Sequence, residues 1–244
     1  MAPWTRLSPL ALVLALVCLG VTAASASAAN SNRLYVNASA DRPAGVDASR
    51  LYDVADHSAS RWKLSVEGNA SRMPGVKDGT QVIGFSKATA AQALGVTTVW
   101  SRTLYKVVTT RRCWRQNGRR RCQTTRRYVK NGVEVVEKDV QLNPSVPWEQ
   151  GPSYPSPTRF DLESTILHEL GHFANPLKDN HVFGCENSPM IDSIAPGEFW
   201  RDADDWLRYG CSASAGGRSK LAVPAAPQMR MLVVEHRLPP RFEH

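Results

Sequence analysis

The stretch that most constrains this chain runs from 164 to 190. It contains His168-Glu169-Leu170-Gly171-His172, a match to H-E-x-x-H, in which two histidines bind a metal ion and the glutamate handles protons. Two residues four apart on an α-helix lie about 40° apart around the axis and roughly 6 Å apart along it. Both imidazoles can therefore reach one ion from one face of a helix, with Glu169 beside it.

The residues around the motif predict a helix with defined ends. Asp161 is a good N-cap, and Asn175 followed by Pro176 ends the helix soon after the motif. Between the two ends lies an apolar stripe that can pack on a sheet: Leu162, Thr165, Ile166 and Leu170. A further metal ligand can come from the returning loop, where His181 is the only histidine close behind.

A catalytic zinc ion uses three protein ligands and keeps a fourth position open for water. His168, His172 and His181 would supply that set. Because Glu169 lies between the first two ligands, it is placed to exchange protons near the ion. We therefore expect one catalytic zinc ion (Zn2+).

The chain resembles the metzincin zinc peptidases from the histidine pair to Ser188-Pro189-Met190. Their pattern is HExxHxxGxxH followed by a methionine turn beneath the metal, and the resemblance assigns that turn to Met190. The likeness covers residues 33 to 211. Three further stretches are similar to the matrixin-like secreted branch: 78–85, 161–164 and 204–210.

The chain departs from the family pattern after His172. Asn175 stands where the family has glycine, and Lys178 stands where the third histidine usually falls. A protonated lysine cannot bind a metal ion, so His181 is the third ligand if the loop is three residues longer than usual. Asp179 is the rival third ligand. No cysteine-switch segment precedes the domain, so the sequence does not support matrixin-type latency.

The resemblance implies an α+β fold of the metzincin type. We expect a twisted mixed sheet packed on two helices, one carrying the histidine motif, and a small irregular C-terminal subdomain that ends in a helix at 204–209. The resemblance also implies a secreted zinc endopeptidase. In that mechanism a zinc-activated water attacks the peptide carbonyl, while Glu169 acts as the general base and then protonates the leaving amine.

The first 29 residues have the pattern of a secretory signal peptide. Arg6 precedes an apolar run from Ser8 to Val21, and the following Ala-rich stretch offers A-x-A cleavage sites. We therefore expect an extracellular protein with no transmembrane segment in the mature chain.

The mature chain is long enough for one domain with a hydrophobic core. We place this domain at 30–211, with an upper part to about 174 and a lower part from about 175. The tail from 212 to 244 is rich in Ala, Gly, Pro and Arg without sustained periodicity, and we expect it to be disordered or loosely docked. We expect a monomer.

Hydrophobic periodicity predicts the elements upstream of the motif. An amphipathic helix is expected at 47–63, and a second Asn-Gly turn is expected at Asn131. The Pro-rich stretch 143–158 is expected to be an irregular loop. A structural calcium ion is compatible with the sequence, which contains no pattern that identifies one. The expected strands are 33–37, 64–66, 81–85, 96–110 and 133–142.

Four cysteines remain after removal of the signal peptide, which predicts two disulfides in an exported chain. Asn117-Gly118 is a strong hairpin turn, and counting outward from it places Cys113 opposite Cys122. Such a position lies near the lower edge of the Cα separation that a disulfide spans. Cys185 and Cys211 are left as the second pair.

The positive charge of the chain is concentrated in one hairpin. The chain has 30 Lys and Arg against 22 Asp and Glu, an excess of +8 that equals the eight arginines of this hairpin. One hypothesis is attachment to an anionic polymer, such as a cell-wall component or nucleic acid. The other is protection of an exposed strand edge. An alternative to the enzyme is thus a non-catalytic secreted zinc protein that binds anionic surfaces through Arg111, Arg112, Arg115, Arg119, Arg120, Arg121, Arg126 and Arg127.

Overall fold

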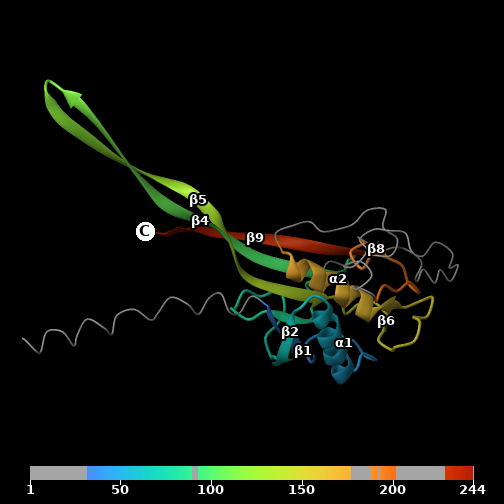
Figure 1. Cartoon of the computed structure of the whole chain (residues 1–244). Helices are drawn as coiled ribbons and strands as arrows, with labels where there is room; N and C mark the ends of the chain where they lie inside the picture. The colour runs from blue at the N-terminus through green and yellow to red at the C-terminus, as the bar shows by residue number, and fades with distance from the viewer. Residues whose placement is uncertain (1–31, 90–92, 177–187, 192, 202–228, 244) are drawn as a thin grey trace, which may run out of the picture. The chain divides into compact units, whose positions relative to one another are not determined.

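A seven-stranded mixed sheet and two helices make up most of the part of the chain that the computed structural model describes (Figure 1). The described residues are 32–89, 93–176, 188–191, 193–201 and 229–243. From Arg33 onward they belong to one compact unit. The expected α+β class, with a mixed sheet and two helices, is therefore confirmed.

The strand order in the sheet is β2-β1-β3-β5-β4-β9-β8. Neighbouring strands among β1, β2, β3 and β5 pair in parallel, β4 runs antiparallel to β5, and β9 runs parallel to β4. The short β8 pairs antiparallel with β9. The strands are β1 (Arg33–Asn37), β2 (Ser65–Asn69), β3 (Val82–Phe85), β4 (Ala93–Gln116), β5 (Arg119–Leu142), β8 (Ser193–Ile194) and β9 (Met229–Glu243).

Two helices pack against this sheet and against each other. In α1 (Ala48–Arg61) the Asp47 side chain accepts a hydrogen bond from the Ser49 amide at 2.8 Å, and in α2 (Leu162–Ala174) Asp161 caps the first turn. The helices are joined where the indole of Trp62 donates to the Leu167 carbonyl at 2.7 Å. Both helices and the Asp161 cap agree with the sequence prediction.

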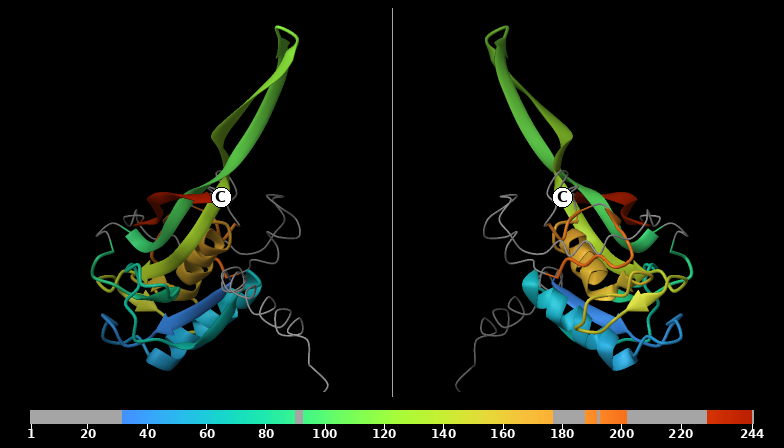
Figure 2. Two further views of the ribbon diagram at one scale, coloured as in Figure 1. Left: turned by 90° about the vertical axis from the view of Figure 1, so that its left-hand side faces the viewer. Right: turned by 90° about the vertical axis from the view of Figure 1, so that its right-hand side faces the viewer.

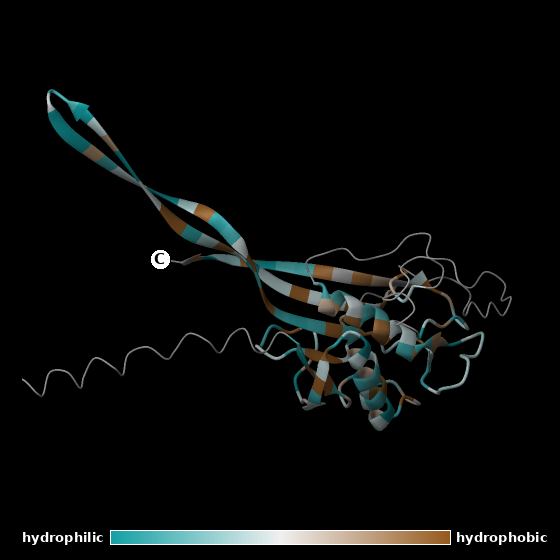
Figure 3. Ribbon diagram, viewed as in Figure 1, coloured by the Kyte–Doolittle hydropathy of each residue, from teal (hydrophilic) through white to brown (hydrophobic). Residues whose placement is uncertain are grey.

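The apolar core lies between the helices and the sheet, where the hydrophobic bands of the ribbon gather (Figure 3). Leu34, Phe85 and Leu142 contribute from the sheet, and Ile166 and Phe173 contribute from α2, all fully buried. The core therefore surrounds α2, in which only Glu163 and Ala174 are not fully buried.

The loop at 143–158 is less irregular than expected. Trp148 and Glu149 form β6, which pairs in parallel with β7 (Phe160–Asp161). This small ladder leads directly into α2, so it sets the position of the N-cap. A two-residue strand has no sequence periodicity, which explains why the pattern did not reveal it.

The prediction of a turn at Asn131 is wrong, because β5 continues through it. Leu104 pairs with Gly132 and Tyr105 with Lys130, so Asn131 is the extra residue of a β-bulge. The flanks on both sides of Asn131 already pair with β4. A second turn would break that continuous ladder, and the extra residue is absorbed as a bulge instead.

Of the two states expected for the tail, disorder is wrong for residues 229–243, which form β9. Ser101 of β4 and Glu235 of β9 lie 134 residues apart in sequence but hydrogen bond at 2.8 Å. Residues 229–234 form a short apolar run without the alternation of a half-buried strand, and pairing over such a distance adds no local signal, which explains the error. Residues 212–228, the expected helix at 204–209 and the proposed signal peptide lie outside the described residues.

β4 and β5 extend beyond the rest of the sheet as a two-stranded arm, which we define as residues 107–128 (Figures 1 and 2). The pairing of β9 with β4 ends at Lys106, and among the described strands only β5 accompanies β4 from there to the turn. Asn117 and Gly118 both have positive φ, 51° and 75°, as a tight hairpin turn requires.

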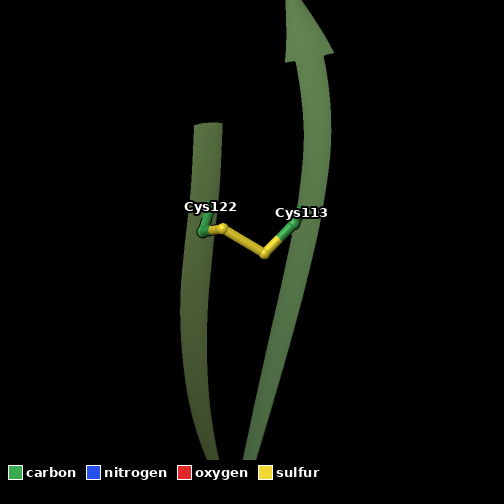
Figure 4. Close-up of a disulfide and its surroundings, with 2 residues drawn as sticks. All are labelled: Cys113 and Cys122. Carbon is green, nitrogen blue, oxygen red and sulfur yellow. A yellow bond between two sulfur atoms is a disulfide. The ribbon is translucent and has the colours of Figure 1, made fainter. Parts of the chain in front are cut away.

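A disulfide crosses the arm near its tip (Figure 4). Cys113 and Cys122 are directly opposite in the ladder, with a Cα–Cα distance of 4.0 Å. The predicted pairing of these two cysteines is confirmed. Cys185 and Cys211 lie outside the described residues, so their pairing stays a prediction.

Candidate metal centre

Two histidine side chains converge on one side of α2. The Nε2 atoms of His168 and His172 lie 2.9 Å apart, and both side chains are buried. Their rings meet edge to face, with centroids 4.7 Å apart. The four-residue spacing thus brings two imidazole nitrogens to one point, as the sequence predicted from helix geometry.

A backbone carbonyl fixes the ring of His168. Its Nδ1 atom lies 2.7 Å from the Pro189 carbonyl oxygen. A carbonyl can only accept, so Nδ1 carries the hydrogen and a neutral ring then presents the lone pair of Nε2. A histidine that binds a metal is commonly oriented in this way. Sequence reasoning missed the role of Pro189, because any residue supplies a carbonyl.

The histidine pair fits a zinc ion. With Zn–N bonds of about 2.0–2.1 Å, two ligands of one tetrahedral ion lie about 3.3 Å apart. The observed 2.9 Å separation needs a change of only a few tenths of an ångström. The expected third ligand His181 and its rival Asp179 lie outside the described residues, as does Lys178. Within the described residues, no group of three His, Cys, Asp or Glu side chains could hold a metal.

Met190 lies in a turn packed against α2, with its side chain fully buried. The Met190 amide donates to the Ser188 hydroxyl at 3.0 Å. A β-carbon on Gly171 would overlap the Met190 sulfur and would lie 2.9 Å from the Trp62 ring. The turn therefore contacts the helix at the residue that immediately precedes His172.

Glu169 points from α2 toward β4. Thr97 places its hydroxyl 2.5 Å from the Glu169 carboxylate and 3.0 Å from the Glu169 carbonyl, so it can donate to either. A β-carbon on Gly95 would lie 2.7 Å from the Glu169 side chain, so only glycine fits there. No sequence signal marked Gly95 or Thr97, because both lie more than 70 residues from Glu169 and act through strand pairing.

Burial gives Glu169 the properties of a proton carrier. The side chain is fully buried, and this burial raises its pKa to about 8, although the hydrogen bonds from Thr97 act in the opposite direction. A carboxyl with a pKa close to neutral can both take and release a proton under ordinary conditions. This carboxyl therefore suits general acid and base chemistry, and it lies on the same helix as the histidine pair.

The segment that carries Met190 is also attached to the start of α2. The Trp200 amide donates to the Ser164 hydroxyl at 2.5 Å, and Arg201 Nε donates to the Asp161 carboxylate at 3.0 Å. Asp161 also accepts from the Ser164 amide at 2.9 Å. The N-cap of the histidine helix is thus fixed by a residue that follows the Met190 turn.

A buried lysine of β5 lies at the other end of the helix. Lys138 Nζ donates to the Phe173 carbonyl at 2.8 Å and lies 4.1 Å from the centre of the Phe173 ring. Burial lowers the pKa of Lys138 to about 8. A cation at the C-terminus of a helix complements the helix dipole, so Lys138 stabilises the last turn of α2.

The eight arginines of the basic hairpin all lie in the arm and are exposed. The ion pairs found among the described residues do not include any of them. Because side chains alternate between the faces of a strand, the cross-strand register divides them equally. One face carries Arg111, Arg115, Arg120 and Arg126, and the other carries Arg112, Arg119, Arg121 and Arg127 with Trp114.

Comparison of the chain with protein-family models, curated proteins and solved structures finds no match. Among the described helices, neither has the length and apolar character needed to span a membrane.

Proposed function

We propose that this chain is a zinc-dependent endopeptidase of the metzincin type, similar to the matrixin-like secreted branch. The observation that carries the proposal is the convergence of His168 and His172, with the ring of His168 oriented by a backbone carbonyl, on the helix that also carries the buried carboxyl of Glu169. A structural metal site would have no use for a proton carrier and would close with a fourth ligand.

His168 and His172 would hold the zinc ion, with His181 as the third ligand. A bound zinc ion supplies Lewis-acid chemistry, lowering the pKa of water and polarising a carbonyl. Glu169 takes the proton from the attacking water and passes it to the leaving amine. Thr97 holds the Glu169 carboxyl against β4, so the proton is exchanged at a fixed position.

The basic arm supports an additional role in attachment. Its exposed arginines lie on both faces of a ribbon that contributes nothing to the core. Guanidinium groups bind phosphate and carboxylate groups through paired hydrogen bonds, so the arm suits an anionic polymer. Attachment without catalysis is the alternative function, and the buried Glu169 on the helix of the two histidines favours the enzyme.

The deciding experiment measures zinc content and cleavage of a denatured protein by the mature chain, with and without a zinc chelator. We expect about one zinc ion per chain and cleavage that the chelator abolishes. Glu169→Gln should keep the zinc ion and lose about 10²- to 10⁴-fold of the turnover, because the amide oxygen still accepts from Thr97 but no longer exchanges a proton. Glu163→Gln, on the same helix, is the matched control.

Near-normal turnover by Glu169→Gln would exclude the proposed mechanism. A full complement of zinc without cleavage by the unmodified chain would favour the binding protein. Secretion is tested separately, since the N-terminus of the exported protein should lie close to residue 30.

A further inference from the structure

The edge of β4 beside Glu169 is occupied by the chain's own strand β9. Gly95 and Thr97 of β4 both lie against Glu169, and they pair in register with Met231 and Val233 of β9. Met231 is 3% exposed and belongs to the core cluster. The backbone groups of β4 nearest to the proposed proton carrier are therefore already paired.

An unpaired strand edge binds an extended polypeptide through backbone hydrogen bonds. A polypeptide paired with β4 at Gly95 and Thr97 would pass directly beside the Glu169 carboxyl, because both residues contact that side chain. An endopeptidase needs its substrate at this position. Such a substrate and β9 cannot occupy the same edge at the same time.

Most of β9 is attached to the sheet by contacts at the surface. From Val234 to Phe242 nearly every described side chain is exposed, whereas the β5 residues from Glu137 to Leu142 are all buried. The surface contacts are a 2.8 Å hydrogen bond from Ser101 to Glu235 and stacking of Trp100 on His236 and Tyr105 on Phe242. Segments with few buried contacts detach more readily than the core.

We propose that β9 is a detachable inhibitory strand, which closes the β4 edge beside Glu169 and must leave before an extended polypeptide can bind there. This inference rests on the proposed peptidase function. It differs from a structural role of β9 in one testable respect: a structural strand stays paired during turnover, whereas an inhibitory strand does not.

A reversible lock tests the proposal in the full chain. Ser101 of β4 pairs in register with Arg237 of β9, and paired strands lie about 4.7–4.9 Å apart, within the Cα separation that a disulfide spans. The double variant Ser101→Cys/Arg237→Cys can therefore cross-link β4 to β9. Cleavage of a denatured protein by the oxidised variant should fall at least tenfold, with unchanged zinc content, and mild reduction should restore it. The single variants Ser101→Cys and Arg237→Cys and the unmodified chain, treated identically, are the matched controls.

A binding measurement separates this inference from the proposed function. The double-cysteine variant is combined with Glu169→Gln, and a labelled synthetic peptide with the sequence of residues 229–243 is added. The peptide should bind the reduced form of this variant at least tenfold more tightly than the oxidised form. If peptide binding depends on the cross-link but no form of the chain cleaves protein, the inhibitory role of β9 is supported and the proposed peptidase function is excluded. Equal cleavage by the oxidised and reduced forms, or peptide binding insensitive to the lock, would overturn the inhibitory strand.

Discussion

The sulfur of Met190 occupies the space that a β-carbon on Gly171 would need. This contact explains why the residue before His172 is glycine, although a glycine inside a helix costs roughly 1 kcal/mol relative to alanine. The close approach lets the Met190 turn lie directly against the helix. It also brings Pro189 to the ring of His168, so one packing contact supports the orientation of a proposed ligand.

Gly171→Ala should destabilise the fold despite the better helix propensity of alanine. We expect a loss of about 1–3 kcal/mol, the usual cost of inserting a methyl group into a packed core. Met190→Ala removes the clash but leaves a cavity, at a cost of about 2–5 kcal/mol. In urea unfolding, the double variant should lose less stability than the sum of the single variants, because the added methyl group fills part of the cavity. Additive losses would show that the two residues do not interact.

Replacing His181 by Ala should remove zinc at neutral pH, whereas Asp179→Ala and Lys178→Ala should retain it. Imidazole is a preferred zinc ligand, and the longer loop can return His181 to the histidine pair. Metal analysis after gel filtration gives the zinc content of each variant. Zinc retained by His181→Ala and lost by Asp179→Ala would assign the third position to the carboxylate.

Asp139 should make the stability of the fold fall as pH rises from about 4 to about 7. Its carboxylate accepts from the Gly75 amide at 2.7 Å and the Val82 amide at 2.8 Å, yet burial raises its pKa from 3.8 to about 7. In that range the folded state holds a proton that the unfolded state has released, so raising the pH favours unfolding.

Asp139→Asn tests this pH dependence. The variant should lose about 1–3 kcal/mol because one backbone amide loses its acceptor oxygen. Compared with the unmodified chain, the variant should lose less unfolding free energy between pH 4.5 and pH 7, because the asparagine side chain does not release a proton. Urea unfolding of both proteins at the two pH values gives the comparison, and an unchanged difference would contradict the assignment to Asp139.

Binding of the arm to an anionic matrix should depend on both of its faces. Replacing the four arginines of either face by Gln should lower retention and reduce its salt dependence by about half. A control with the same loss of charge replaces four exposed cations outside the arm by Gln: Lys63, Arg72, Lys77 and Lys87. Retention that changes with one face only would indicate a flat partner, and retention that changes with neither would leave edge protection as the role of the arginines.

Cys185 and Cys211 should be joined by a disulfide. Closing a loop of this length stabilises a fold by typically 2–4 kcal/mol, so reduction should lower the melting temperature. Peptide mapping without reduction identifies the linkage. A bond between Cys185 and Cys113 would contradict both this prediction and the observed bond to Cys122.

Local patterns in the sequence predicted the helices and the hairpin at the tip of the arm because their determinants are close in the chain. The Asp161 cap and the apolar stripe specify α2, and the Asn117-Gly118 turn fixes the register that pairs Cys113 with Cys122. In each case a few neighbouring residues decide the conformation, and the structure agrees with the pattern.

The contacts around Glu169 could not be predicted in the same way. Thr97 and Gly95 reach it only because β4 packs against α2, and β9 reaches them only because it pairs with β4 on the side opposite β5. The run from Met229 to Val234, apolar at five of its six positions, was the available signal for a strand. The prediction of a turn at Asn131 is wrong for the opposite reason. The local Asn-Gly signal is strong, but the residues on both sides of it pair with β4.

The alternation of side chains in the arm limits how related chains can differ in length. Deleting one residue from each strand keeps the tip paired but moves its side chains to the opposite face and changes the hydrogen-bonding type of each pair. Deleting two from each strand preserves both. A single extra residue in one strand is absorbed as a bulge, as Asn131 shows. Insertions and deletions between 107 and 128 should therefore come in multiples of four residues, with single-residue exceptions at bulges.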